Sequence, residues 1–158
     1  MQANQVYELQ KKTAEYQIGD REKRPWGDYI VTDVGFNDAG EEYCEKKITV
    51  NPGRILSLQS HEHRRETWMV VRGVLTILLD GVRTDLHAGE KIHVPQGSIH
   101  CMANLGKAPC VVREKQEGFC REDDITRYID AYGRGTQAST LPVVKRGIAA
   151  YRTILAGM

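Results

Sequence analysis

The 158-residue sequence lacks the features of several large protein classes. No apolar run approaches the roughly 18 residues that cross a bilayer, and the polar start does not resemble a secretion signal. The 22 basic and 21 acidic residues leave a formal charge of +1, with no basic block that would suit nucleic acid or an anionic membrane. We therefore expect no membrane partner, no nucleic-acid partner and a cytoplasmic location.

Cysteine is also scarce. The four cysteines, Cys44, Cys101, Cys110 and Cys120, form no CxxC pair and fit neither a zinc-finger spacing nor a disulfide scaffold. Buried, inert thiols in a reducing compartment are the simplest interpretation. With 41% hydrophobic and 27% charged residues, the composition is that of an ordinary globular protein, and the length predicts one domain.

The middle of the chain consists of short β-branched runs separated by turn signals. These runs cover residues 29–32, 47–50, 67–71, 74–79, 91–94 and 110–113. Asp80-Gly81 predicts a hairpin with a type I′ turn, because both central residues of that turn need positive φ. Many short strands at this spacing predict an all-β sandwich or barrel.

The two ends of the chain show helical spacing instead. Apolar residues recur at helical intervals over 6–16, over 125–132 after the acidic stretch Glu122-Asp123-Asp124, and over 143–155. We expect an all-β domain between helices that pack on it or on a partner subunit. The expected parts are an N-terminal helix and linker (1–23), a β barrel (24–120) and a C-terminal helical segment (121–158).

Two stretches place polar residues at intervals that suit a metal site. Gln59 and His61 are two residues apart on one strand and therefore project from the same face. Glu66 follows on the next strand after a tight turn, and His100 enters a third strand after a Pro-Gln-Gly turn. An amide oxygen, two imidazoles and a carboxylate make a divalent cation site with open positions. These donors favour Zn²⁺ and also suit Fe²⁺, Mn²⁺ or Co²⁺.

The same spacings resemble the two sequence motifs of the cupin family. The second motif, Pro-x-Gly-x-x-His, matches at every defining position up to His100, whereas Gln59 stands where the first motif usually has a histidine. The resemblance implies a single cupin barrel, a double-stranded β-helix or jelly roll, with short N- and C-terminal helices. Such domains often form homodimers, and we expect one here.

Two other interpretations of the first motif remain open. His61 and His63 could be the strand pair, although the intervals back to Gly53 and on to Gly73 favour Gln59, His61 and Glu66. A metal-free barrel whose polar residues are satisfied by hydrogen bonds is the other interpretation.

Longer stretches resemble the isomerase domain of type II phosphomannose isomerases. These are the Arg-Pro-Trp-Gly stretch at 24–27, the Gln-Ser-His-Glu-His-Arg stretch at 59–64 and the segment 122–134. The resemblance implies a metal-dependent interconversion of mannose 6-phosphate and fructose 6-phosphate through a cis-enediol. In that family a guanylyltransferase domain usually precedes the cupin; none is found here, so we expect no guanylyltransferase activity.

The resemblance also implies roles for individual side chains. Arg64 would clamp the phosphate or an enediolate oxygen, unless it is an exposed surface arginine. His63, if it is not a ligand, would serve as an acid or base. Lys46 and Glu114 match family positions on barrel strands and would contact substrate, although outward-facing positions are the alternative for both.

Two further residues bear on the choice of function. Thr67 replaces a family histidine and, as the neighbour of Glu66 on a strand, should face away from the metal. Trp68 is two residues after Glu66, so it should lie on the same face and form apolar cavity wall. The small-molecule partner is expected to be a sugar phosphate. The alternatives are a non-catalytic cupin that binds a sugar phosphate or related metabolite, and a metal-dependent dioxygenase, which Gln59 disfavours.

Overall fold

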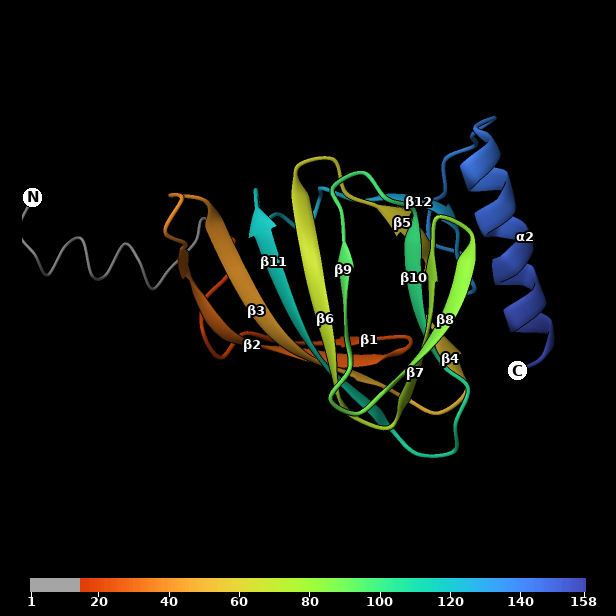
Figure 1. Ribbon diagram of the computed structural model, residues 1–158, viewed down its shortest axis with the longest axis horizontal. Coiled ribbons are helices and arrows are strands. Elements are labelled where there is room, and N and C mark those ends of the chain that lie inside the picture. Colours follow the sequence, from red (N-terminus) through yellow and green to blue (C-terminus); the bar gives the residue numbers. More distant parts are fainter. Residues whose placement is uncertain (1–14) are drawn as a thin grey trace, which may run out of the picture.

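The computed structural model describes residues 15–158, so most of the helix expected over 6–16 falls outside the described residues. Two β-sheets face each other, and helix α2 lies against the outside of one of them (Figure 1). In chain order the elements are β1 (Arg21–Arg24), β2 (Gly27–Phe36), β3 (Glu42–Val50), β4 (Arg54–Ile55), β5 (Leu58–Ser60), β6 (Arg64–Arg72), β7 (Val74–Leu79), β8 (Val82–His87), β9 (Lys91–Val94), β10 (His100–Asn104), β11 (Cys110–Gly118), β12 (Thr126–Ile129) and α2 (Pro142–Ala156).

The strand order is that of a jelly roll. One sheet runs β1-β2-β3-β11-β6-β9, and the other runs β12-β5-β10-β7-β8 with β4 paired to β10. The described strands pair antiparallel throughout, and neighbours such as β3 and β11 are far apart in sequence. The chain therefore crosses repeatedly between the two sheets, and the all-β prediction is confirmed. Strand β1 extends the sheet back to Arg21, before the expected boundary at residue 24.

Alternation along the strands brings polar side chains into the barrel. On β6, Arg64, Glu66, Trp68 and Val70 are buried, whereas the residues between them are only half-buried. Because successive side chains of a strand point to opposite faces, the buried set shares the interior face. The register places polar residues of neighbouring strands opposite one another on this face, for example Glu66 opposite Gln116. The barrel thus has an apolar core at one end and a polar cluster at the other.

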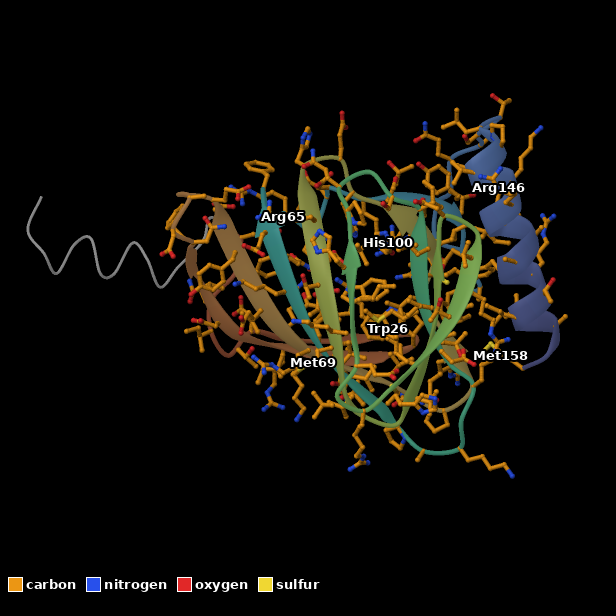
Figure 2. The ribbon with its side chains drawn as sticks, viewed as in Figure 1. Trp26, Arg65, Met69, His100, Arg146 and Met158 are labelled. Carbon is orange, nitrogen blue, oxygen red and sulfur yellow. The ribbon has the colours of Figure 1, made fainter. Side chains whose placement is uncertain are left out.

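The turn between β7 and β8 has the predicted geometry. Asp80 and Gly81 adopt φ values of 50° and 84°, as a type I′ turn requires. Gly81 also lies against α2, since a Cβ added there would sit 3.0 Å from the Cβ of Arg146, which Figure 2 labels on the helix. The hairpin tip and the helix therefore pack together.

Helix α2 confirms the helix expected over 143–155. Its buried residues Val144, Tyr151 and Ile154 belong to an apolar cluster with residues of β4, β5 and β10. Gly147 allows α2 to lie close to β5, because a Cβ at this position would lie only 3.0 Å from the Leu58 side chain. Within the described residues, no helix is long and apolar enough to cross a membrane.

The helix expected over 125–132 is wrong, because this segment forms strand β12. It pairs with the edge of β5, and the register shifts between Arg127 and Ile129. Such a bulge places two consecutive residues opposite one partner. Tyr128 and Ile129 therefore both pack against the apolar cluster under α2. Two adjacent apolar residues on one face are typical of a helix, which explains the wrong prediction. Pairing with β5 overrides the local helical pattern.

The cysteine prediction is confirmed. All four cysteines are buried and free. Burial raises the pKa of the Cys44, Cys101 and Cys120 thiols to about 12 in each case. These thiols therefore stay protonated at neutral pH and are poor nucleophiles.

Candidate metal and anion site

Three predicted metal ligands meet inside the barrel. His61 follows β5, Glu66 is on β6 and His100 starts β10, and each offers a ligand atom within 4.8 Å of the others. All three side chains are 2% exposed. Figure 2 shows His100 among the barrel strands. Separate parts of the chain therefore bring two imidazoles and a carboxylate to one buried point, as the motif spacing predicts.

The two imidazoles present their Nε2 atoms to this point. His61 Nδ1 lies 2.7 Å from the carbonyl oxygen of Asp124, and His100 Nδ1 lies 3.0 Å from that of Ser98. A ring nitrogen that faces a carbonyl oxygen must donate, so Nδ1 is protonated in both rings and Nε2 is the atom turned toward the shared point. His100 Nε2 is buried and has no hydrogen-bond partner in the described part of the chain. Burial lowers the pKa of His100 to about 4, which leaves it neutral at pH 7.

Glu66 is an ionised carboxylate in this cluster. Burial alone would raise its pKa, but His61 and Arg64 lower the pKa well below the ordinary value. Its Oε1 lies 3.1 Å from His61 Nε2, and its Oε2 accepts a 2.9 Å hydrogen bond from Trp68 Nε1. The sequence predicted only an apolar wall at Trp68. The indole N–H therefore has a role that was missed, although the i, i+2 spacing from Glu66 could have indicated it.

Gln59 joins the cluster and His63 does not. The Gln59 Nε2 lies 3.4 Å from His61 Nε2, and its Oε1 accepts a 2.7 Å hydrogen bond from Ser57. The His63 side chain is 56% exposed and packs edge-on against Phe119 at the rim. The geometry therefore agrees with the set of Gln59, His61, Glu66 and His100 and disagrees with the alternative pair of His61 and His63.

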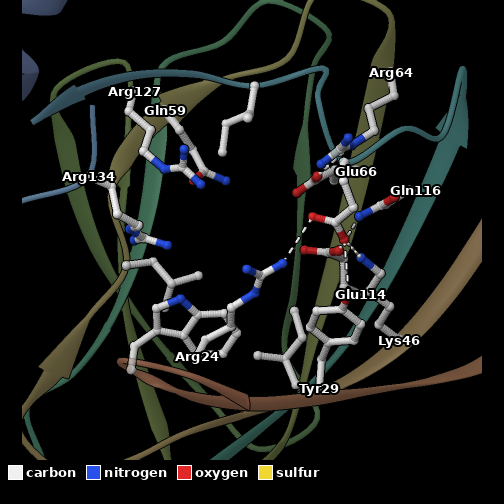
Figure 3. A pocket seen from close by; sticks show the side chains of 15 residues that line it. Arg24, Tyr29, Lys46, Gln59, Arg64, Glu66, Glu114, Gln116, Arg127 and Arg134 are labelled. Carbon is white, nitrogen blue, oxygen red and sulfur yellow. Dashed lines mark hydrogen bonds and ion pairs between the residues drawn. The ribbon is translucent and has the colours of Figure 1, made fainter. Parts of the chain in front are cut away.

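A pocket opens beside these donors, with about 570 Å³ of empty space that includes the open solvent at its mouth. Its lining includes five basic side chains (Arg24, Lys46, Arg64, Arg127 and Arg134) and three acidic ones (Glu66, Glu114 and Glu122). Figure 3 shows the guanidinium groups of Arg24, Arg127 and Arg134 pointing into the pocket from one side, with Arg64 and Glu66 on the other. The basic excess suits an anionic ligand.

Arg127 has no close ion-pair partner among the described residues, although Asp130 and Glu122 lie near enough to favour its charge. Gln59 is paired in register with His100 on one side and with Arg127 on the other, so the three side chains project from one face of the sheet. Arg127 Nε is buried and has no hydrogen-bond partner among residues 15–158. Burial and the nearby positive charges of Arg134 and Arg24 lower the pKa of Arg127. A negatively charged ligand would relieve this repulsion.

The other two guanidinium groups are held in place by carboxylates. Arg134 donates through Nε and Nη2 to Asp130, at 2.9 Å each. Arg24 pairs with Glu22 at 2.9 Å and with Glu122 at 3.3 Å. Both side chains are thereby fixed with donors left over, because a guanidinium has five N–H groups.

Lys46 lies inside the barrel, not in solvent. Its Nζ lies over the rings of Tyr16 and Tyr29, 4.1 and 4.2 Å from their centroids, and forms a 3.2 Å ion pair with Glu122. Burial opposes the charge of Glu122, but Lys46 and the two tyrosine hydroxyls outweigh it and lower the pKa of Glu122 to about 2. The ammonium of Lys46 is therefore already neutralised.

Glu114 also faces inward, and the alternative of an outward salt bridge is wrong. It is buried and accepts a 2.7 Å hydrogen bond from Gln116 Nε2. Burial and the negative charge of Glu66 raise the pKa of Glu114 to about 7. Glu114 therefore changes its charge near neutral pH within the wall of the pocket.

The acidic stretch 122–124 serves the site instead of starting a helix. The Asp124 carboxylate accepts the backbone N–H groups of Glu62 and His63, at 2.9 and 3.0 Å, and its carbonyl orients His61. Glu122 holds Lys46 and Arg24. These roles were missed, as was Arg127, because the expected helix over 125–132 hid which side chains point inward.

Residues 11–130 match the family model described as mannose-6-phosphate isomerase C-terminal. The mannose-1-phosphate guanylyltransferase of Escherichia coli (strain K12) is 41% identical over 121 residues, which are 76% of this chain and 24% of that protein. The alginate biosynthesis protein AlgA of Pseudomonas aeruginosa is 42% identical over 122 residues, which are 77% of this chain and 24% of that protein. The chain thus spans about a quarter of the length of these relatives.

Solved structures with the same fold have much lower identity. The capsular polysaccharide assembling protein CapF from Staphylococcus aureus superposes with a TM-score of 0.60 at 15% identity, over 68% of this chain and 33% of that one. An RmlC-like cupin from Shewanella frigidimarina gives 0.56 at 23% identity, over 73% of this chain and 98% of that one. These similarities confirm the predicted cupin fold.

The function predicted from the sequence was wrong. The relatives of this chain are named as mannose-1-phosphate guanylyltransferases and alginate biosynthesis proteins, which are enzymes of carbohydrate metabolism, and not as isomerases of mannose 6-phosphate. The resemblance was correct for the cupin domain, but a shared domain does not transfer a reaction. The catalytic roles expected for Arg64 and His63 therefore lose their basis, and His63 lies at the rim.

Proposed function

Since this chain belongs to the mannose-6-phosphate isomerase C-terminal family, we propose that it is a cupin domain that binds one divalent cation and, beside it, a phosphorylated mannose. This is the non-catalytic alternative that the sequence left open. The observation that carries the proposal is the cluster of Arg24, Arg127 and Arg134 in the same pocket as the metal donors. The relatives' name, mannose-1-phosphate guanylyltransferase, supports a mannose phosphate as the ligand.

The cation would be held by Gln59, His61, Glu66 and His100. The unpartnered, neutral His100 Nε2 supports this assignment, because a buried acceptor without a partner is costly unless a ligand satisfies it. Rotation of the Gln59 amide about its last bond would turn its oxygen toward His61, and Ser57 would then accept from the amide NH₂. Zn²⁺ suits this donor set, as do Fe²⁺, Mn²⁺ and Co²⁺. When bound, the cation would supply positive charge that attracts oxygens of the ligand.

The arginine cluster would hold the phosphate. Guanidinium groups match phosphate oxygens in a two-pronged geometry, which an ammonium group cannot provide. Trp26, Ile48 and Leu56 supply apolar wall for the sugar ring.

Replacement of Arg127 tests this proposal. In the zinc-loaded protein, Arg127→Gln is expected to weaken binding of mannose 1-phosphate by about 10- to 100-fold, since it removes charge-assisted hydrogen bonds to the phosphate. Isothermal titration calorimetry measures the change.

Arg83→Gln is the matched control, because Arg83 lies on β8 and pairs with exposed Asp85. Its affinity should equal that of the unmodified protein. Equal affinities for all three proteins, or no binding of mannose 1-phosphate at all, would contradict the proposed function.

A further inference from the structure

Arg64 lies on top of two of the proposed metal ligands. The side chain is buried, its Nε donates to Glu66 Oε1 at 3.1 Å, and its Nη2 lies 3.3 Å from His61 Nε2. His61 Nδ1 donates to the carbonyl of Asp124, so a neutral His61 offers its Nε2 lone pair to Arg64, and the same Nε2 lies 3.1 Å from Glu66 Oε1. A third contact, from Nη1 to the carbonyl of Arg121 at 2.7 Å, fixes the guanidinium in this position.

The contact with His61 cannot coexist with a metal ion on the same atom. A neutral imidazole has one lone pair on the unprotonated nitrogen, so His61 Nε2 either accepts from Arg64 or binds a cation. Coulomb repulsion acts in the same direction, because a dication bound to His61 and Glu66 would lie next to the guanidinium charge in a buried environment. Arg64 therefore has to move before His61 can serve as a ligand.

We propose that the Arg64 guanidinium occupies the place of a metal ion. Without a metal it neutralises Glu66 and donates to His61, and metal binding displaces it into the pocket lined by Arg24, Arg127 and Arg134. The displaced guanidinium can turn into the adjacent pocket, because Arg64 already lines it together with Arg24, Arg127 and Arg134. It would there become a fourth guanidinium for the phosphate. The inference rests on the proposed function and adds that cation and phosphate binding are coupled.

The coupling has a required direction. A cation that releases Arg64 raises the affinity for the phosphorylated sugar, and by thermodynamic linkage the sugar raises the affinity for the cation by the same factor. Direct attraction between the cation and the phosphate also contributes. The part that depends on Arg64 is separated by removing this side chain.

The test compares zinc affinity in three proteins without sugar: the unmodified chain, Arg64→Met and Arg65→Met. Methionine keeps most of the buried stem of Arg64 but cannot donate to His61 or Glu66. Arg64→Met is expected to bind Zn²⁺ about 10-fold more tightly, because no charge-assisted hydrogen bonds have to be broken first. Arg65 is the matched control, since it lies next along β6 and pairs with Glu41 and Glu117 away from the ligand cluster.

Unchanged or weaker zinc binding by Arg64→Met would overturn the inference. If that variant does not fold, crystal structures of the unmodified protein decide instead: Arg64 should contact His61 Nε2 without zinc and leave it when zinc is bound. An Arg64 that keeps this contact in the zinc complex overturns the inference as well.

A second titration measures the coupling with mannose 1-phosphate. Zn²⁺ should increase the affinity of the unmodified protein for this sugar phosphate, and the increase should be about 10-fold smaller in Arg64→Met. Absence of zinc or sugar binding in the unmodified protein overturns the proposed function together with this inference. Normal binding of both, with an increase that does not depend on Arg64, overturns this inference alone.

Discussion

Replacement of His100 by alanine is expected to lower the affinity for Zn²⁺ on the order of 100-fold. Structural zinc sites bind with about 10–16 kcal/mol, so one of four ligands accounts for about 3 kcal/mol. His100 is the ligand whose Nε2 has no other partner in the described chain, so nothing except the cation is lost at that atom. Titration against a chromophoric chelator measures the affinity.

His93→Ala is the matched control for this experiment. His93 lies on β9, and its ring contacts Thr67 on the outer surface of the sheet, far from the interior face that carries Glu66. Its zinc affinity should be unchanged. If His100→Ala bound zinc as tightly as His93→Ala does, the ion would have to bind elsewhere on the protein, and the assignment of His100 as a ligand would be wrong.

Replacement of Trp68 by alanine should lower the free energy of unfolding by about 3–5 kcal/mol. Trp68 is among the largest fully buried side chains and contacts His100 with a centroid distance of 5.4 Å. Its removal leaves a cavity between the apolar core and the ligand cluster, which the rigid barrel strands cannot close. Urea denaturation of the metal-free protein measures the loss.

The variant Trp68→Phe distinguishes the packing contribution of the Trp68 ring from its hydrogen bond to the Glu66 carboxylate. Phenylalanine retains most of the apolar volume but cannot donate to Glu66 Oε2. We expect a smaller loss of stability and a 10- to 100-fold loss of zinc affinity, which is about the range seen when a hydrogen bond to a ligand is removed. Unchanged zinc affinity would show that Trp68 acts through packing only.

The metal-donor cluster was predictable because strand periodicity and short turns are local. Two residues on one strand share a face, so the intervals from Gln59 to His61 and from Pro95 to His100 were sufficient to place these donors. The same periodicity placed Thr67 outside and Trp68 inside. The type I′ turn at Asp80-Gly81 was likewise a property of two adjacent residues.

The anion side of the pocket was not predictable in the same way. Arg127 points inward only because β12 adds to the edge of β5, and that pairing joins residues almost 70 positions apart. The bulge in β12 also gives its apolar residues a spacing typical of a helix, so the sequence pattern predicted the wrong element. The inward positions of Lys46 and Glu114 depend on the register between β3, β11 and β6, which no single stretch of sequence specifies. The expected homodimer stays a prediction.

The most direct measurement is anomalous diffraction at the zinc edge from a crystal of the zinc-loaded protein. We expect one strong peak inside the barrel, at about 2.0–2.1 Å from Nε2 of His61 and of His100 and about 2.0–2.2 Å from Glu66, with the Gln59 amide oxygen as the fourth protein ligand. A barrel interior without such a peak, or a peak ligated by His63 and surface carboxylates instead, would contradict this expectation.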